Sequence, residues 1–235
     1  MTGLALALVP FLAAGPLPPE VIPVEALRSP FCLVAESVRI SVGKDLAIVE
    51  GDYDFKYVRR YDAAAMPDQI PFYYAVFVPR SADSLADFNA ITEAKLHLGS
   101  LDFQPEDFVL LPDGPEAAVQ IAPADARIAV LVFKIPRRLL RQQCRLQISH
   151  YQPHYHCAGK IVAAYLPLLP DFESLKNELL FSRSDFTVEF ETVDAVRLRR
   201  LSVNQSVERE TPQRVSVHPV DRENIAVDVA GLPGK

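Results

Sequence analysis

Residues 45–57 read DLAIVEGDYDFKY, and their side chains alternate in character along the chain. The odd positions from Ala47 to Tyr57 are apolar, aromatic or glycine, and the even positions from Glu50 to Lys56 are charged. Successive side chains of a β-strand point to opposite faces of its sheet, so a period of two is typical of a half-buried strand. The stretch therefore predicts a β-strand with one buried face and one face in water.

The sequence on either side continues this pattern. Val38, Ile40 and Val42 alternate in the same way, and Gly43, Lys44 and Asp45 predict a turn between two strands. Residues 72–78, FYYAVFV, are apolar throughout and predict a fully buried central strand. Further short strands are predicted at 94–103, 108–111, 117–121, 127–135, 145–151 and 160–166. Short strands with Pro, Asp and Gly between them favour a mainly β protein, an antiparallel β-sandwich of immunoglobulin-like general architecture.

Helices are sparse in the sequence. The best pattern covers residues 171–181, where Asp171 can cap and three apolar residues share one face. A weaker helical turn covers residues 81–90, and residues 136–140 predict a crossover turn between two strands. Later strand candidates are 186–192, 193–203, 214–217 and 224–229.

The chain divides into three predicted parts. Residues 1–30 read as a signal peptide with a proline-rich leader, and residues 31–170 read as the β-sandwich domain. Residues 171–235 supply one short helix and a β-rich C-terminal extension. This extension either packs on the sandwich or forms a small second domain.

Composition narrows the class of protein. The chain has 235 residues, of which 49% are hydrophobic and 20 are proline, which argues against both a disordered and an all-helical protein. A net charge of -6 disfavours nucleic acid as a partner, because DNA-binding domains usually carry a basic excess. No apolar run is long enough for a transmembrane span, which needs about 18–20 residues.

The amino terminus predicts export to the periplasm or the extracellular space. Residues 3–14, GLALALVPFLAA, suit the apolar core of a signal peptide, and Leu12, Ala13 and Ala14 make a passable cleavage site. The basic residues that usually precede such a core are missing, so the alternative is an N-terminal strand packed on the domain.

The cysteines leave two alternatives open. Cys32, Cys144 and Cys157 form no C-x-x-C pair, so neither a zinc knuckle nor a thioredoxin-type redox pair is indicated. Cys144 and Cys157 flank a predicted hairpin and are the first pair to test for a disulfide. The alternative is three buried, free thiols.

Residues 150–157, HYQPHYHC, contain three of the five histidines of the chain. In a strand, His154 and His156 point to the same side about 6.6 Å apart, a workable separation for two ligands of one zinc or copper ion. His150 has the same parity, and a further ligand is needed from elsewhere in the fold. The predicted metal ligands are thus His154, His156 and His150. The alternative is a turn whose imidazole and phenol rings stack and bond to the backbone.

Other clusters of charge are better explained without a ligand. Glu50, Asp52 and Asp54 stand in a row on a strand, whereas calcium needs carboxylates that converge on one point. Arginines at 137–145 and 197–200 suit the protection of sheet edges, with an acidic polymer or phosphate as the lesser alternative. Asn204, Gln205 and Ser206 form a glycosylation sequon.

No nucleophile elbow, Walker loop, dinucleotide fingerprint or H-E-x-x-H motif is present in the sequence. The leading hypothesis is therefore an exported, non-catalytic binding or structural module without a cofactor. It would engage a protein or a glycan through an exposed strand edge or a loop surface. The alternative is a zinc or copper protein or enzyme centred on residues 150–157, and a third possibility is a sugar-active protein with paired carboxylates.

Overall fold

The computed structural model describes residues 31–57, 68–110, 125–141, 143–167, 185–201, 206–219 and 224–231. Within these residues the strands form three sheets of eight, four and three strands, and α1 (Leu85–Thr92) is the one α-helix. The prediction of a mainly β fold with a short helix is confirmed.

The largest sheet is built around β1 (Phe31–Val42) and β2 (Leu46–Tyr57), which form the hairpin expected from the alternating sequence. β8 (Gln143–Pro153) pairs with β2, and β11 (Phe186–Thr192) pairs with β1. Beyond these lie the outer strands β14 (Arg214–His218), β13 (Ser206–Thr211), β4 (Lys95–Leu98) and β5 (Leu101–Phe103).

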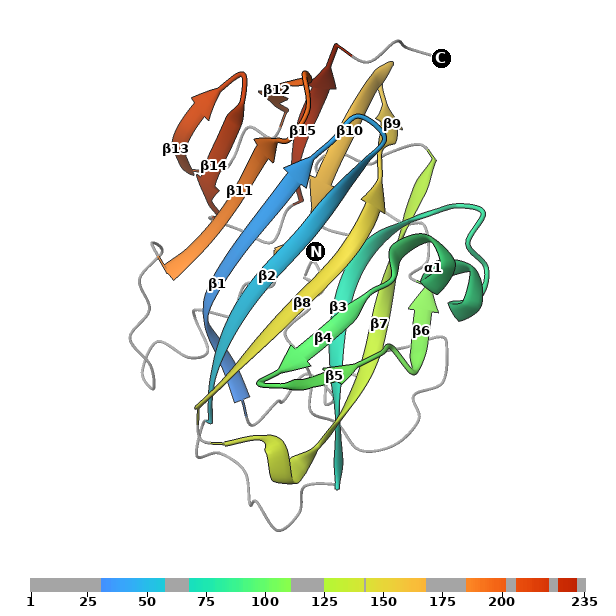
Figure 1. The fold of residues 1–235 in the computed structure, drawn as a ribbon, viewed down its shortest axis with the longest axis vertical. Helices are drawn as coiled ribbons and strands as arrows, with labels where there is room; N and C mark the ends of the chain where they lie inside the picture. Colours follow the sequence, from blue (N-terminus) through green and yellow to red (C-terminus); the bar gives the residue numbers. More distant parts are fainter. Residues whose placement is uncertain are drawn as a thin grey trace, which may run out of the picture.

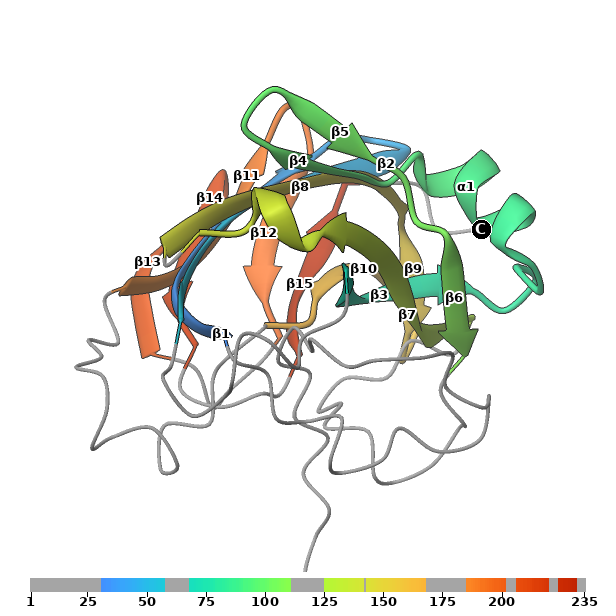
Figure 2. The same ribbon diagram turned by 90° about the horizontal axis from the view of Figure 1, so that it is seen from below.

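Two smaller sheets lie behind the large one, which arches over them in the view from below (Figures 1 and 2). The four-stranded sheet has the order β12 (Arg197–Arg200), β15 (Ile225–Ala230), β10 (Lys160–Tyr165), β9 (Tyr155–Cys157). The three-stranded sheet has the order β3 (Gln69–Pro79), β7 (Ala126–Pro136), β6 (Asp107–Leu110). The main hydrophobic core therefore lies between the inner face of the large sheet and the two smaller sheets.

The apolar run at 72–78 lies in β3, which is buried but is an edge strand of its sheet, not the central strand that we predicted. Its two faces pack in different places: Phe72 and Tyr74 join the main core, whereas Ala75 and Phe77 join a second cluster that includes Val162 of β10. Because both faces are covered, every position must be apolar, even though one edge of the strand has no partner among the described strands.

The immunoglobulin-like detail of the prediction is not confirmed. β1 and β11 run parallel, with Glu36 opposite Phe186 and Val42 opposite Thr192, whereas an antiparallel sandwich was expected. Alternation within a strand shows which residues face the core, but it carries no information about the direction of a neighbour distant in the sequence.

Strands that follow residue 170 are hydrogen-bonded to strands that precede it, because β11 pairs with β1 and β15 pairs with β10. β11 and β14 lie in the large sheet. The predicted leader over 1–30, the strand over 117–121, the helix over 171–181 and the domain boundary at 170 lie outside the described residues.

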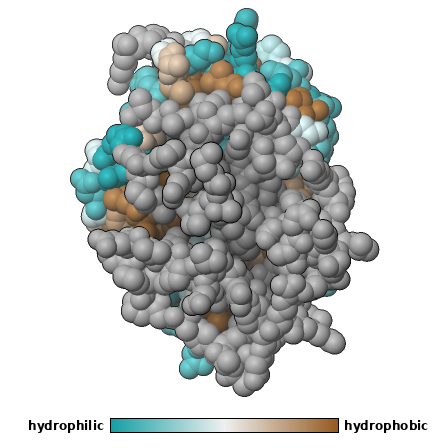
Figure 3. Space-filling model, turned by 180° about the vertical axis from the view of Figure 1, so that it is seen from behind, coloured by the Kyte–Doolittle hydropathy of each residue, from teal (hydrophilic) through white to brown (hydrophobic). Residues whose placement is uncertain are grey.

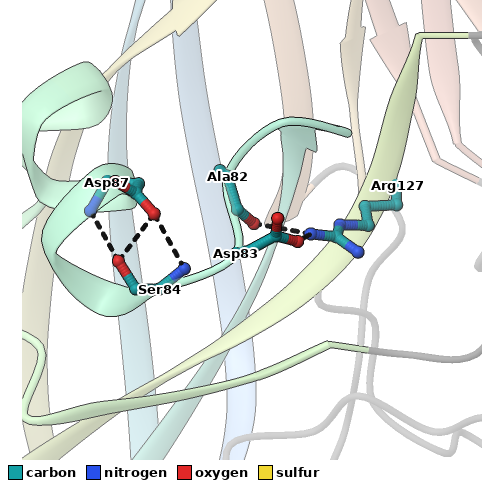
Figure 4. Close-up of polar contacts among 5 residues, drawn as sticks. All are labelled: Ala82, Asp83, Ser84, Asp87 and Arg127. Carbon is teal, nitrogen blue, oxygen red and sulfur yellow. Dashed lines mark hydrogen bonds and ion pairs between the residues drawn. The ribbon is translucent and has the colours of Figure 1, made fainter.

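The weaker helical turn predicted over 81–90 is present as α1, which begins at Leu85 and ends at Thr92, and its start is well defined (Figure 4). Ser84 and Asp87 form a capping box: the Asp87 backbone N–H donates to Ser84 Oγ, and the Ser84 N–H donates to Asp87 Oδ2, each at 3.1 Å. Arg127 of β7 donates to Ala82 O at 2.7 Å and to Asp83 Oδ1 at 2.5 Å. The segment that leads into the helix is therefore tied to the three-stranded sheet.

One strand prediction needed correction, one strand was missed, and one predicted turn is present. The expected strand over 94–103 is the hairpin β4–β5, whose turn contains Gly99 with φ of 63°, a conformation that suits glycine. β13 was not predicted, because all six of its residues are exposed and show no alternation of apolar and polar positions. The predicted crossover turn is present as the 3₁₀ turn η3 (Arg137–Leu139) between β7 and β8.

None of the helical residues that the structure describes makes a segment long and apolar enough to span a membrane. Seen from behind, hydrophobic surface of the described residues is visible at several separate places (Figure 3).

Candidate functional site

A groove of about 550 Å³ lies on the outer face of the eight-stranded sheet, the face opposite the main core. It crosses six neighbouring strands, from β14 through β11, β1, β2 and β8 to β4, and this face is turned to the viewer in Figure 1. Polar side chains line most of it. We call this feature the outer groove.

The outer groove follows from the period of two seen in the sequence. On β2, Glu50 and Asp52 point outward while Val49 and Tyr53 are fully buried. Sheet register then aligns polar residues of neighbouring strands in a row across the sheet, in the order Lys95, Ser149, Glu50, Arg39, Glu189 and Ser216. Short side chains such as Ser37, Ser149 and Thr187 leave space between longer ones, which gives the groove its depth.

Most charged groups of the groove are held in pairs. Asp52 Oδ1 accepts a hydrogen bond of 2.8 Å from Gln147 Nε2 and lies 3.5 Å from Arg145 Nε. Glu189 forms an ion pair with Arg214. The exposed pair of Asp52 and Arg145 adds little to stability, but both pairs fix the directions of their side chains.

Glu50 differs from these neighbours. Its side chain is exposed at the floor of the groove, and no residue in the described part of the chain forms a hydrogen bond or ion pair with it. Arg39, which is its cross-strand neighbour, is directed to Glu191, with 3.7 Å between Nε and Oε1. The groove thus presents one carboxylate that is available to a partner.

An exposed apolar patch adjoins the groove at the end of the sheet near the β1–β2 turn. Ile48 and Tyr151 lie opposite each other on β2 and β8, and 36% and 38% of their surfaces are exposed. Leu46 is 39% exposed, and Val193, whose N–H donates to Val42 O, is 60% exposed. We call Leu46, Ile48, Tyr151 and Val193 the apolar end.

Inside the molecule, a buried hydrogen-bond network joins the three sheets. Tyr165 of β10 donates to Glu36 Oε1 of β1 at 2.5 Å, and its hydroxyl lies 2.8 Å from that of Tyr53 on β2. Tyr53 donates to the Tyr74 hydroxyl of β3 at 3.3 Å, and Tyr74 lies 3.4 Å from His150 Nε2 of β8. A polar group in the core is costly unless it is hydrogen-bonded, so these contacts favour one arrangement of the sheets.

Burial sets the charge of this network. Loss of hydration, reinforced by neighbouring ionisable groups that include Glu36, raises the pKa of Tyr53 and Tyr165 well above the ordinary value. Burial also lowers the pKa of His150 to about 4, because the ring contact with Tyr151 O compensates only part of the lost hydration. Since that carbonyl can only accept, His150 Nδ1 carries the proton and Nε2 accepts from Tyr74. The network therefore holds neutral hydroxyls and a neutral imidazole at pH 7.

Gly51 allows Tyr53 to reach the network. A Cβ atom at position 51 would lie 2.3 Å from the Tyr53 hydroxyl oxygen and 2.6 Å from two ring carbons. Both residues face the core from the same strand, so the tyrosine ring lies directly over the glycine backbone. Without this close approach the ring would take another position.

The three predicted metal ligands make separate contacts. His150 lies in the core, His154 Nε2 donates to Gly43 O at 2.8 Å, and His156 Nδ1 lies 2.7 Å from Asp125 Oδ2. The change of face between Gln152 and Tyr155, both buried, places the irregularity at Pro153 and His154. In the described ranges no group of three His, Cys, Asp or Glu side chains is placed to hold a metal ion together. The metal site stays a prediction.

The cysteine pair suggested by the sequence is not formed. Cys144 and Cys157 are both free, and Cys144 lies near the start of β8 whereas Cys157 follows the end of that strand. The stretch from 144 to 153 alone spans about 30 Å when extended, which is far too long for a disulfide. Burial raises the pKa of the Cys144 thiol to about 11, and the nearby charge of Asp54 makes a smaller contribution in the same direction.

The sequence reasoning missed both the outer groove and the buried network. Two signals for the network were present in the sequence. Glu36 has the inward parity of Val38 and Ile40, and His150 has that of Ile148. A charged or titratable residue at an inward position of a strand indicates a buried polar partner. Which tyrosines supply the partners depends on how the sheets stack.

Comparison with known proteins adds little to what the geometry shows about the site. No protein-family model and no curated protein matches the chain. Among solved structures, native yeast LTA4 hydrolase is similar with 10% sequence identity and a TM-score of 0.40, over 89% of this chain and 33% of the hydrolase. Yeast LTA4 hydrolase in complex with bestatin gives 8% identity and a TM-score of 0.37, over 85% and 28% of the two chains. The chain thus spans about a third of that enzyme, and similarity at this level establishes neither a fold nor an activity.

Proposed function

We propose that this chain is a non-catalytic binding module, exported to the periplasm or the extracellular space, that holds a protein or glycan in the outer groove. The observation that carries the proposal is the groove itself, a polar depression of about 550 Å³ across six strands of one sheet. Export is proposed from the apolar run at residues 3–14.

Rigidity of the walls supports binding in the groove. Each groove residue sits on a strand whose backbone is fixed by sheet pairing on both sides, and several side chains are held by ion pairs or hydrogen bonds. A partner therefore meets groups that are already oriented, and less conformational entropy is lost on binding.

Strand addition at the β13 edge of the large sheet is a less favourable mode of binding. β13, at one edge of the large sheet, carries Glu208, Arg209 and Glu210, and its pairing with β14 is irregular between Val207 and Arg209. Charges and bulges of this kind oppose the pairing of a further strand. Compared with addition of a strand at the β13 edge, contact through the surface of the groove is therefore the better supported mode.

The experiment compares two variants in binding screens. The full chain is screened against a glycan array and a phage-displayed peptide library, together with the variants Ser149→Trp and Ser81→Trp. Ser149 lies in the groove on β8, whereas Ser81 is exposed before α1 and does not line it. We expect ligands of the wild type to be retained by Ser81→Trp and lost by Ser149→Trp, because the indole fills the groove.

Circular dichroism and urea unfolding of both variants provide the control for folding. Ligands that bind Ser149→Trp and wild type equally would place binding elsewhere on the molecule and contradict the proposal. Failure of the folded wild-type chain to select any ligand from either collection would contradict it as well.

A further inference from the structure

We infer that the partner is a protein segment in extended conformation that carries an apolar residue and, two positions away, a lysine or arginine. The inference rests on the proposed function, since it names what occupies the outer groove. Three observations lead to it: the apolar end, the free carboxylate of Glu50, and the distance between them.

The distance follows from strand geometry. Ile48 and Glu50 are both outward-facing residues of β2, two positions apart, so their Cα atoms are separated by about 6.6–6.8 Å. Alternate residues of an extended ligand have the same spacing. A segment that lies along β2 can therefore place the side chain of one residue against Ile48 and the side chain two positions away against Glu50.

The apolar end selects the first of these side chains. Ile48 packs beside Tyr151 in register, and Leu46 continues the surface along β2. Contiguous exposed apolar residues beside a polar groove are typical of protein interaction sites. A leucine or isoleucine of the ligand would remove this surface from water, whereas the hydroxyls of a glycan would lose hydration there without gaining partners.

Charge around the apolar end selects the second side chain. Carboxylates are in excess around Glu50 and the apolar end, where Asp45, Glu50, Glu191 and Asp194 outnumber the cationic residues Lys44, Arg39 and Lys95. Lys95 lies in the same cross-strand row as Glu50, beyond Ser149, and forms no ion pair with it among the described residues. Arg39 is already paired with Glu191, and Asp194 Oδ2 accepts from the backbone N–H of Lys44 at 2.7 Å. Glu50 is left to attract a cation, and charge complementarity favours a basic ligand.

A second basic residue in the ligand would add less binding affinity than the first. Continuing along β2, the next outward residue is Asp52, which is already bonded to Gln147 and paired with Arg145. The recognised pattern is therefore apolar–x–basic, and the residues of the ligand beyond the basic one contribute little to affinity.

The test uses three labelled peptides and four forms of the full chain. The peptides are GSLTRSG, its charge-reversed form GSLTESG and its apolar-deleted form GSSTRSG. The proteins are the wild type, Glu50→Gln, Ile48→Ser and Glu106→Gln, of which the last removes a carboxylate that pairs with Lys134, remote from the groove. Binding is measured by fluorescence anisotropy, and on densely coated surfaces where multivalency amplifies weak affinity.

We expect GSLTRSG to bind wild type and Glu106→Gln alike, and to bind Glu50→Gln about two- to fivefold more weakly at low salt. Ile48→Ser should weaken binding as well, and both other peptides should bind poorly to the wild type. Amide chemical shifts that change on titration should include those of residues 48–50, which distinguishes this surface from the apolar areas visible in Figure 3.

Either of two results in the peptide assay, or either of two in the screens, would overturn the inference. Equal binding of GSLTRSG and GSLTESG would show that the charge of the ligand does not matter. Unchanged affinity of Glu50→Gln for GSLTRSG would show that the Glu50 carboxylate does not contribute to binding. If the screens with Ser149→Trp show groove-dependent glycans while none of the three peptides binds, this inference fails and the proposed function stands. If the screens find no groove-dependent ligand of any class, both fail.

Discussion

Beneath the ring of Tyr53 there is room for the hydrogen atom of Gly51 but not for a methyl group. Tyr53 is fully buried, and its hydroxyl contacts both Tyr74 and Tyr165, so the ring has no free space into which to move. One glycine therefore determines whether the hydroxyls of three sheets meet.

We predict that Gly51→Ala lowers the free energy of unfolding by about 2–3 kcal/mol, because overpacking displaces the ring and breaks buried hydrogen bonds. Urea unfolding measures the change, with Ser37→Ala on the outer face as a control expected within about 0.5 kcal/mol of wild type. In a Tyr53→Leu background the cost of Gly51→Ala should be smaller, since the two residues are in contact. Equal stability of Gly51→Ala and wild type would show that the ring is not confined.

For single residues, the sequence predicted which side chains are buried better than it predicted their hydrogen-bond partners. The inward parity of Tyr53 and the outward parity of Glu50 were readable from alternation alone. The partners of Tyr53 come from β3 and β10, which lie in other sheets, and no local pattern connects them. The histidines of residues 150–157 were singled out as a group, but each makes its contact with a different segment.

Among the elements, α1 depends on its cap more than a longer helix would. It has eight residues, and an isolated helix of that length is not stable in water. Its stability comes from burial of Phe88, from the box of Ser84 and Asp87, and from the contact of Arg127 with the preceding residues (Figure 4).

Ser84→Ala should lower the free energy of unfolding by about 1 kcal/mol, because the backbone N–H of Asp87 loses its acceptor. Thermal or urea unfolding measures this loss. Ser81→Ala, at an exposed position before the helix, serves as the matched control and should have almost no effect. A loss of the same size in both variants would argue against a specific role for the cap.

At the scale of elements, prediction succeeded where the information is local. β1, β2 and β7 follow from alternation or from β-branched runs, and η3 follows from its proline. β4 and β5 were merged because Gly99 alone marks their turn, and β13 was missed because no face of it is buried. The parallel pairing of β1 with β11 could not be predicted, since it joins segments with no local relation.

For the molecule as a whole, the buried imidazole of His150 couples folding to pH. Its pKa is about 4 in the folded protein and has an ordinary value of 6.5. Between these two values the unfolded chain binds a proton that the folded chain does not bind. The contribution of His150 to the free energy of unfolding is therefore fully present above pH 6.5 and is lost as the pH is lowered toward 4.

We predict that His150 accounts for a loss of about 3 kcal/mol across that window, and that His150→Gln removes this part of the pH dependence. Urea unfolding of both proteins at intervals from pH 7.5 to pH 4 tests the prediction. His154, whose pKa burial also lowers, contributes with the same sign in both proteins and cancels in the difference. Parallel stability curves for the two proteins would show that His150 does not titrate on unfolding.

The parallel pairing of β1 with β11 also bears on how the chain folds during synthesis. Glu36 is paired with Phe186, 150 residues later in the chain. At a translation rate of about 5–20 residues per second, synthesis of the residues between β1 and β11 takes roughly 8–30 s. During that time one edge of the β1–β2 hairpin is open to other nascent chains. Completion of the sheet is therefore a late event, and the edge of β1 that β11 covers in the finished sheet is exposed during synthesis.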